Sequence, residues 1–206
     1  CMNCLRSLDY IKKIDNKYKK YGLKTILIHP PEWDFEKDSN NIIRAAKKYK
    51  IKMPIIFDKN KKIIKKLKID FWPSQILIKN KKIVYRHVGE GAYGKLEEKI
   101  RKILKAKTKG IFEKEPGYTK LPTVYAGKNK HGKISKSKNN LGFGIMYING
   151  VWKQGNESLT GKGSLTIKTK GKTVSMVAKS INRNPIKINI KLNNKHIKNR
   201  TINYPQ

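Results

Sequence analysis

The 206-residue sequence is poor in cysteine, in acidic side chains and in long apolar runs. No apolar run approaches the roughly 20 residues that a membrane-spanning helix requires, and the first residues lack the basic and apolar regions of a signal peptide. Only four histidines accompany two cysteines, and none of them is paired at a metal-ligand spacing. We therefore expect no metal site. The sequence begins with Cys1 and not with Met, so we expect it to be part of a longer product.

Acidic residues are scarce, with 14 Asp and Glu against 49 Lys and Arg, which gives a formal charge of +35. A charge of this size can indicate binding to nucleic acid or to an anionic membrane, or it can reflect a biased composition. The positive charge is almost all lysine, spread from Lys12 to Lys198 among Asn and Ile. Nucleic-acid-binding proteins concentrate Arg and aromatic residues on one face. We favour a solvated lysine surface that binds polyanions weakly, with no specific nucleic-acid partner.

The two cysteines form a C-x-x-C motif, Cys1-Met2-Asn3-Cys4, at the start of an apolar-periodic segment that Gly22 ends. Thiols at this spacing face the same way on a helix and can close a small disulfide ring. The free N–H groups of a first helical turn favour a thiolate. The motif therefore predicts a redox pair in which Cys1 attacks and Cys4 resolves, with no other cofactor. Half of a zinc site has the same spacing, and a mature lipoprotein also begins with cysteine, although that would leave Cys4 unexplained.

Helical and strand patterns alternate in the first half of the chain, which predicts an α/β domain. After the first helix, the pattern predicts two short strands, two helices, a hairpin and a last helix. Their expected ranges are Leu23–His29, a helix capped by Ser39, Met53–Phe57, Asp58–Leu67, Gln75–Ile78 with Ile83–His87, and Tyr93–Leu104.

The second half has no helical periodicity. A polar segment with Pro and Gly, residues 106–122, is typical of a linker. Short runs bounded by Gly and Asn follow it, and they predict a small, jelly-roll-like β-sandwich over residues 123–206. The expected strands are Phe143–Trp152, Ser164–Lys170, Thr173–Ala178 and Ile186–Leu192.

The segment Phe71-Trp72-Pro73-Ser74 precedes the strand that begins at Gln75. A proline at the entrance of a buried strand is a candidate for a cis peptide bond. If this segment folds back onto Cys1, the backbone beside Pro73 can pair with an extended substrate peptide. Trp72, Pro73 and Ser74 are therefore candidate substrate-groove residues.

Four motifs together closely resemble the thioredoxin-like domain of DipZ-type thiol:disulfide interchange proteins, which belong to the TlpA-like class. The motifs are CMNC (Cys1–Cys4), HPPEWDFEKD (His29–Asp38), FWPSQILI (Phe71–Ile78) and HVGEGAY (His87–Tyr93). The resemblance implies a thioredoxin-like domain over residues 1–105, with Cys1 and Cys4 as the redox pair and Pro73 as the cis-proline. It also implies that the central strand before Cys1 is missing from this sequence, which would leave two neighbouring strands with unpaired edges.

The same resemblance implies an extracytoplasmic thiol–disulfide oxidoreductase that reduces substrate proteins. Its electrons would come from a membrane-embedded domain upstream, to which the full-length protein would be tethered. The loop with Glu32 is expected near the thiols, where the carboxylate could relay the proton that Cys4 loses; a solvated carboxylate is the alternative. We expect His87 and Glu90 to be structural or solvated.

The β module resembles the carbohydrate-binding-like module that follows the thioredoxin domain in this family, and we expect it to be incomplete at its C-terminus. Tyr125, Tyr147 and Trp152 are candidates for its ligand face, although a Trp in the middle of a strand is often a core residue. A competing hypothesis is a non-catalytic glycan- or protein-binding protein whose cysteines form a structural disulfide. A thiol peroxidase fits less well, because Arg6 alone does not make a peroxide site.

Overall fold

The computed structural model describes residues 1–112, 123–137, 141–170, 174–182 and 184–202. The chain divides into two compact units, Cys1–Lys170 and Gly171–Gln206. The domain boundaries expected at residues 105 and 123 stay predictions, because residues 113–122 of the expected linker lie outside the described part. No helix in the described ranges is both long and apolar enough to cross a bilayer.

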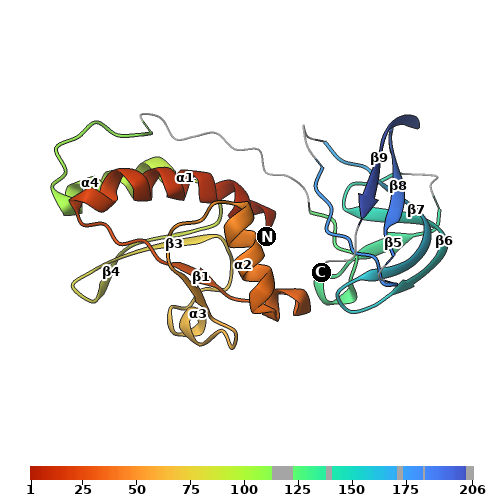
Figure 1. Ribbon diagram of the computed structural model, residues 1–206, viewed down its shortest axis with the longest axis horizontal. Helices are drawn as coiled ribbons and strands as arrows, with labels where there is room; N and C mark the ends of the chain where they lie inside the picture. Colours follow the sequence, from red (N-terminus) through yellow and green to blue (C-terminus); the bar gives the residue numbers. More distant parts are fainter. Residues whose placement is uncertain (113–122, 138–140, 171–173, 183, 203–206) are drawn as a thin grey trace. The chain divides into compact units, whose positions relative to one another are not determined.

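Two helices form the core of the first domain. Helix α1 (Met2–Tyr18) continues into the 3-10 helix η1 (Lys19–Tyr21), and Gly22 ends it with a φ of 95°. Helix α4 (Tyr93–Leu104) has the bounds that the periodicity predicts. The two helices run side by side along one face of the strands, and α3 lies on the other side (Figure 1). Their apolar stripes meet in a core whose buried members are Ile14, Tyr18, Leu96, Ile100 and Ala106.

A buried carboxylate fastens the segment after α4 to this core. Glu97 is 2% exposed and accepts a hydrogen bond of 2.5 Å from the Tyr18 hydroxyl. It also accepts from the backbone N–H of Ile111, at 2.6 and 2.8 Å, and from that of Phe112, at 2.9 Å. Ile111 and Phe112 pack against the core as well. The stretch 106–112, expected as the start of the linker, is therefore part of the packing of the first domain.

The strands of this domain form two separate pairs. Strand β1 (Leu27–His29) is parallel to β2 (Ile55–Phe57), and β3 (Ser74–Lys79) forms an antiparallel hairpin with β4 (Lys82–Val88). Within the described residues, no strand pairing joins one pair to the other.

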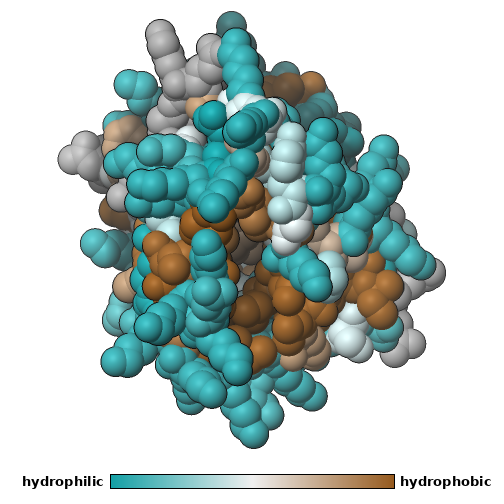
Figure 2. Space-filling model, turned by 90° about the vertical axis from the view of Figure 1, so that its left-hand side faces the viewer, coloured by the Kyte–Doolittle hydropathy of each residue, from teal (hydrophilic) through white to brown (hydrophobic). Residues whose placement is uncertain are grey.

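Apolar side chains in or next to both pairs are accessible. Ile26 is 54% exposed, Ile56 40% and Ile78 56%. The face in Figure 2 likewise shows apolar side chains gathered among hydrophilic ones. Parallel strands are normally covered on both faces, and Ile56 of β2 departs from that rule.

The side-chain carboxylates of Asp38 and Asp58 accept hydrogen bonds from backbone N–H groups at the starts of helices α2 and α3. The 3-10 helix η2 (Asp34–Lys37) precedes helix α2 (Ser39–Lys48), and the cap of α2 is Asp38, which accepts from the Asn40 N–H at 2.9 Å. The expectation that Ser39 caps this helix is therefore wrong. Helix α3 (Lys62–Lys66) begins later than expected, because residues 58–61 form a turn that ends with Lys61 at a φ of 57°. The buried Asp58 accepts from two backbone N–H groups of α3, both at 3.0 Å, from outside the helix.

The remaining elements of the first unit are β-structure with one helical turn, η3 (Lys128–Lys130). Strand β6 (Ile145–Gln154) is flanked by β5 (Lys133–Ser135), which is parallel to it, and by β7 (Leu159–Ile167), which is antiparallel.

The second unit contains a hairpin of β8 (Ile186–Leu192) and β9 (Lys195–Ile202). The strand expected over Thr173–Ala178 is wrong for residues 174–178, which have no regular structure, and Thr173 lies outside the described part. The strands confirm β-structure in the second half of the chain, and their assembly into a sandwich stays a prediction.

Candidate active site

The helix start places the two thiols in different environments. Cys1 is the N-cap of α1 and is exposed, whereas Cys4 lies in the first turn and is half-buried; both are free thiols. The pKa of Cys4 is raised to about 11, chiefly by desolvation and in smaller part by repulsion from the carboxylates of Glu36 and Glu32, against a lowering by the amino group of Cys1. A substrate can therefore reach Cys1, while Cys4 stays protonated at neutral pH.

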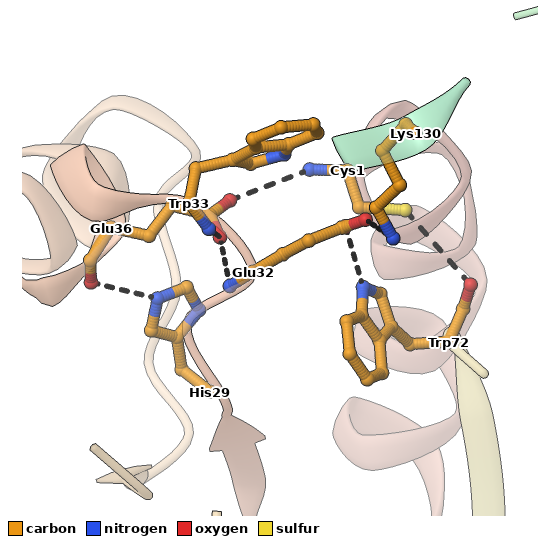
Figure 3. A network of polar contacts seen from close by, with 7 residues as sticks. All are labelled: Cys1, His29, Glu32, Trp33, Glu36, Trp72 and Lys130. Carbon is orange, nitrogen blue, oxygen red and sulfur yellow. Dashed lines mark hydrogen bonds and ion pairs between the residues drawn. The ribbon is translucent and has the colours of Figure 1, made fainter. Parts of the chain in front are cut away.

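The segment around Pro73 lies against Cys1. The Trp72–Pro73 peptide bond is cis, and the Cys1 Sγ lies 4.0 Å from the Trp72 carbonyl oxygen (Figure 3). The Ser74 hydroxyl donates to the Phe71 carbonyl at 2.6 Å, and this hydrogen bond stabilises the turn formed by residues 71–74. The structure thus brings Cys1 together with two of the three expected groove residues, and Ser74 holds the turn that carries them.

Two carboxylates lie near Cys1 (Figure 3): that of Glu32, in the loop before η2, and that of Glu36, within η2. The Glu32 carboxylate accepts from the Trp72 indole N–H at 3.2 Å and forms an ion pair of 2.7 Å with Lys130. Glu36 shapes this loop, because its Oε2 accepts from the backbone N–H groups of Glu32, at 2.6 Å, and Trp33, at 3.1 Å. Sequence reasoning missed Glu36. A glutamate three residues after the start of a helical turn is the signal that could have found it.

Two residues expected to be structural or solvated are at least partly buried. Glu90 is 8% exposed and accepts two hydrogen bonds from Arg6, so the solvated alternative is wrong for Glu90. His87 is half-buried, and its Nε2 has no hydrogen-bond partner among the described residues. Arg6, set aside as evidence for a peroxidase, is an anchor of the helix start.

The three aromatic residues expected to form a ligand face do not share a face. Tyr147 is 3% exposed, and its hydroxyl accepts from the Gly142 N–H at 2.8 Å. Tyr147 and Trp152 are five residues apart on β6, and side chains alternate along a strand, so they point to opposite faces. Tyr125 is 36% exposed, with its ring centroid 6.2 Å from that of Trp33. Tyr147 is therefore unavailable to a ligand in this structure.

Across the described ranges, no three His, Cys, Asp or Glu side chains lie close enough to hold a metal ion. The chemistry that the arrangement offers is that of its two thiols, with two carboxylates beside them.

Comparison with known proteins gives three findings. The family profile of the Redoxin proteins matches residues 1–104. Protein DipZ of Mycobacterium tuberculosis is 32% identical over 126 residues, which cover 60% of this chain and 18% of DipZ. The thiol-disulfide oxidoreductase ResA of Bacillus thuringiensis is 30% identical over 104 residues, which cover 50% of this chain and 57% of ResA.

Among solved structures, a thiol:disulfide interchange protein DsbE from Chlorobium tepidum aligns with a TM-score of 0.46 at 20% identity. The alignment covers 50% of this chain and 72% of that protein. The chain spans less than two thirds of the length of DipZ and of ResA.

Proposed function

This chain belongs to the Redoxin family, as a TlpA-like protein of the thioredoxin fold, and from that premise we propose that it reduces disulfide bonds in substrate proteins. The observation that carries the proposal is the pairing of an exposed Cys1 with a half-buried Cys4 at the start of α1, with Cys1 Sγ 4.0 Å from the carbonyl oxygen of Trp72. The ResA and DipZ similarities support the same activity.

In the first step, the Cys1 thiolate attacks one sulfur of a substrate disulfide. A bond forms between Cys1 Sγ and that sulfur, the substrate disulfide breaks, and the second substrate sulfur leaves as a thiolate that takes up a proton. The substrate backbone lies in an extended conformation beside Pro73, next to the Trp72 carbonyl that lies 4.0 Å from Cys1 Sγ. Exposure of Cys1 is what makes this step accessible.

In the second step, Cys4 attacks Cys1 Sγ. The Cys4 thiol first loses its proton, the Cys1–Cys4 disulfide forms, and the remaining substrate sulfur leaves and is protonated. Two electrons have then passed from the protein to the substrate. Because desolvation raises the pKa of Cys4 to about 11, this step needs a proton acceptor, and Glu32 is the candidate for that role. No organic cofactor or metal takes part.

Insulin reduction tests this function, with dithiothreitol as the electron source. Cys1→Ser should abolish turnover, and Cys4→Ser should accumulate a mixed disulfide with insulin that mass spectrometry detects. The competing hypothesis of a structural disulfide in a binding protein requires that the folded wild-type chain give no turnover. A Cys4→Ser protein that traps no substrate would overturn the assigned roles.

We further propose that the protein acts on the extracytoplasmic side and receives its electrons from a membrane-embedded domain of the full-length protein. The similarity to DipZ supports this location. A reductant of this kind should have a reduction potential near that of thioredoxin, about −270 mV, whereas a disulfide-forming oxidant lies near about −120 mV. Equilibration of the Cys1–Cys4 pair with glutathione or dithiothreitol distinguishes the two directions of electron flow.

For residues 123–206 we propose an accessory module of the carbohydrate-binding-like kind, on the strength of strands β5–β9. Since Tyr147 is buried, Tyr125 and Trp152 remain the candidates for contact with a glycan or a protein partner. Glycan-array binding by the wild-type chain and by Trp152→Ala tests this assignment, and equal binding by both would remove Trp152 from the ligand face.

A further inference from the structure

The thiols lie at the start of α1, whereas the core contacts between α1 and the β3–β4 hairpin involve its later residues: Leu77 and Tyr85 of the hairpin pack against the cluster that contains Ile14 and Tyr18. Through its later residues, including Ile14 and Tyr18, helix α1 packs on α4. Across the described residues, the β3–β4 hairpin that follows Pro73 makes no strand pairing with β1 or β2. Disulfide exchange nevertheless needs Cys1 and Pro73 at a fixed separation, because a substrate must contact both.

A bidentate ion pair joins the cysteine-bearing end of α1 to the turn between β4 and α4. Arg6 Nε donates to Glu90 Oε1 at 2.9 Å, and Arg6 Nη2 donates to Glu90 Oε2 at 2.8 Å. The Glu90 side chain is 5% exposed and that of Arg6 29%. Two parallel hydrogen bonds from a planar guanidinium fix orientation as well as distance. Arg6 Nη2 also donates to Asn3 Oδ1 at 2.5 Å, so the pair contacts the dipeptide between the cysteines.

Hydrogen bonds also connect the turn that carries Glu90 to the segment around Pro73. The Gly89 N–H donates to the Pro73 carbonyl at 2.8 Å, and Gln75, which is 7% exposed, donates from its side chain to the Gly91 carbonyl at 2.9 Å. Gly89 and Gly91 have φ values of 101° and 103°, a backbone conformation that residues with a side chain rarely adopt. The two glycines therefore allow the turn that carries Glu90. A continuous path of hydrogen bonds therefore leads from Asn3 to Pro73.

We propose that Arg6 and Glu90 are positioning residues that hold the cysteine-bearing turn of α1 at a fixed distance from the Pro73 groove. This role rests on the proposed function, since it concerns the reduction of protein disulfides. A protein substrate must occupy the groove while Cys1 attacks, whereas a small aromatic disulfide reaches the exposed Cys1 without the groove. Loss of the pair should therefore impair protein substrates selectively.

The test compares two substrates in one set of variants. For Arg6→Gln, Glu90→Gln and the double variant, kcat/KM for insulin and the rate of the first thiol exchange with Ellman's reagent are measured. The substrate ratio, which is kcat/KM for insulin divided by the rate of the first exchange with Ellman's reagent, should fall at least about tenfold in each single variant. The double variant should fall no further, because either change alone removes the bridge.

Arg86→Gln is the matched control. Its guanidinium lies on β4 and donates to the carbonyls of Leu67, at 2.5 Å, and Lys68, at 3.0 Å, without contacting α1 in any described hydrogen bond. This change also removes an arginine and its hydrogen bonds, so any cost in stability that is not specific to the site should appear here too. The substrate ratio of Arg86→Gln should equal that of the wild type.

Each outcome decides the matter. Partial unfolding, or a change in the reactivity of Cys1 caused by the unpaired charge, would change insulin reduction and the exchange with Ellman's reagent together. The ratio of the two would then stay at the wild-type value, and that result would overturn the proposal. Arg6→Lys keeps the charge but not the bidentate geometry, and its ratio should lie between those of the wild type and Arg6→Gln. A folded wild-type chain that exchanges with Ellman's reagent but does not reduce insulin would overturn the proposed function, and the positioning role with it.

Discussion

Replacing Glu32 by Gln separates two opposite effects that this carboxylate can have on Cys4. The negative charge of Glu32 contributes to raising the pKa of Cys4, which is about 11 chiefly because the thiol is desolvated. At that pKa, only about one Cys4 thiol in 10⁴ is ionised at pH 7. As a mere charge, Glu32 makes this fraction smaller and slows resolution. As a proton acceptor, it removes the proton during the attack and accelerates resolution.

The two roles predict opposite changes in the rate at which Cys4 resolves the mixed disulfide. Gln is nearly the same size as Glu and can still accept from the Trp72 indole N–H, which donates to Glu32 at 3.2 Å. A positioned general base contributes about 10²- to 10⁴-fold, so we expect Glu32→Gln to slow resolution at least about 100-fold. If the charge alone mattered, the pKa of Cys4 would fall and resolution would become faster, not slower.

Ellman's reagent follows both chemical steps in one stopped-flow trace. Attack by Cys1 releases a first thiolate, and resolution by Cys4 releases a second, so the slow phase reports Cys4 alone. Asp34→Asn is the control, because Asp34 lies two residues from Glu32 at the start of η2, its side chain is 75% exposed, and it is not among the groups that shift the pKa of Cys4. A slow phase in Glu32→Gln that equals or exceeds that of the wild type would refute the relay.

Three further predictions concern ionisation and packing. In a Cys1→Ser protein, alkylation of Cys4 by iodoacetamide should accelerate about tenfold per pH unit up to about pH 10, because burial raises the pKa of Cys4 to about 11; a plateau near pH 8.5, the ordinary thiol range, contradicts this. Glu97→Gln should lower the free energy of unfolding by about 2 to 4 kcal/mol in urea titrations, because a buried acceptor of three N–H and O–H groups loses its charge. The exposed neighbour Glu98 offers the control, since Glu98→Gln should change it by less than about 0.5 kcal/mol. Burial and the bond to Glu97 raise the pKa of Tyr18, so stability should be full below about pH 10 and fall as pH rises above it; Tyr18→Phe should flatten that fall.

Local signals predicted much of the fold because they involve neighbours in the sequence. The apolar spacing of α4 and the polar turn between β3 and β4 gave nearly the observed bounds. Strand β9 went unnoticed for a physical reason: seven of its eight residues are exposed, so no alternation of apolar and polar side chains marks it. Strand β5 has only three residues, which is too short for any period to appear.

The parts of the candidate site that depend on the type and spacing of nearby residues were predictable from the sequence. The contacts between residues far apart in the sequence were not. The C-x-x-C spacing and the proline before β3 are visible in the sequence. The partner of Arg6 is 84 residues away, and that of Tyr18 is 79 residues away. No periodicity links such residues, so Glu90 was assigned no contact with α1 and Glu97 none at all.

The scarcity of acidic residues makes their placement informative. Only 14 Asp and Glu are present, against 49 Lys and Arg, and three of them, Asp58, Glu90 and Glu97, are buried anchors that accept hydrogen bonds. Glu32 and Glu36 lie beside the thiols. A carboxylate accepts several N–H groups at once in a small volume, which a lysine cannot do. We therefore expect lysine to be tolerated at solvated positions such as Asp34 and Glu98, and to be disruptive where the fold or the thiol chemistry needs an acceptor.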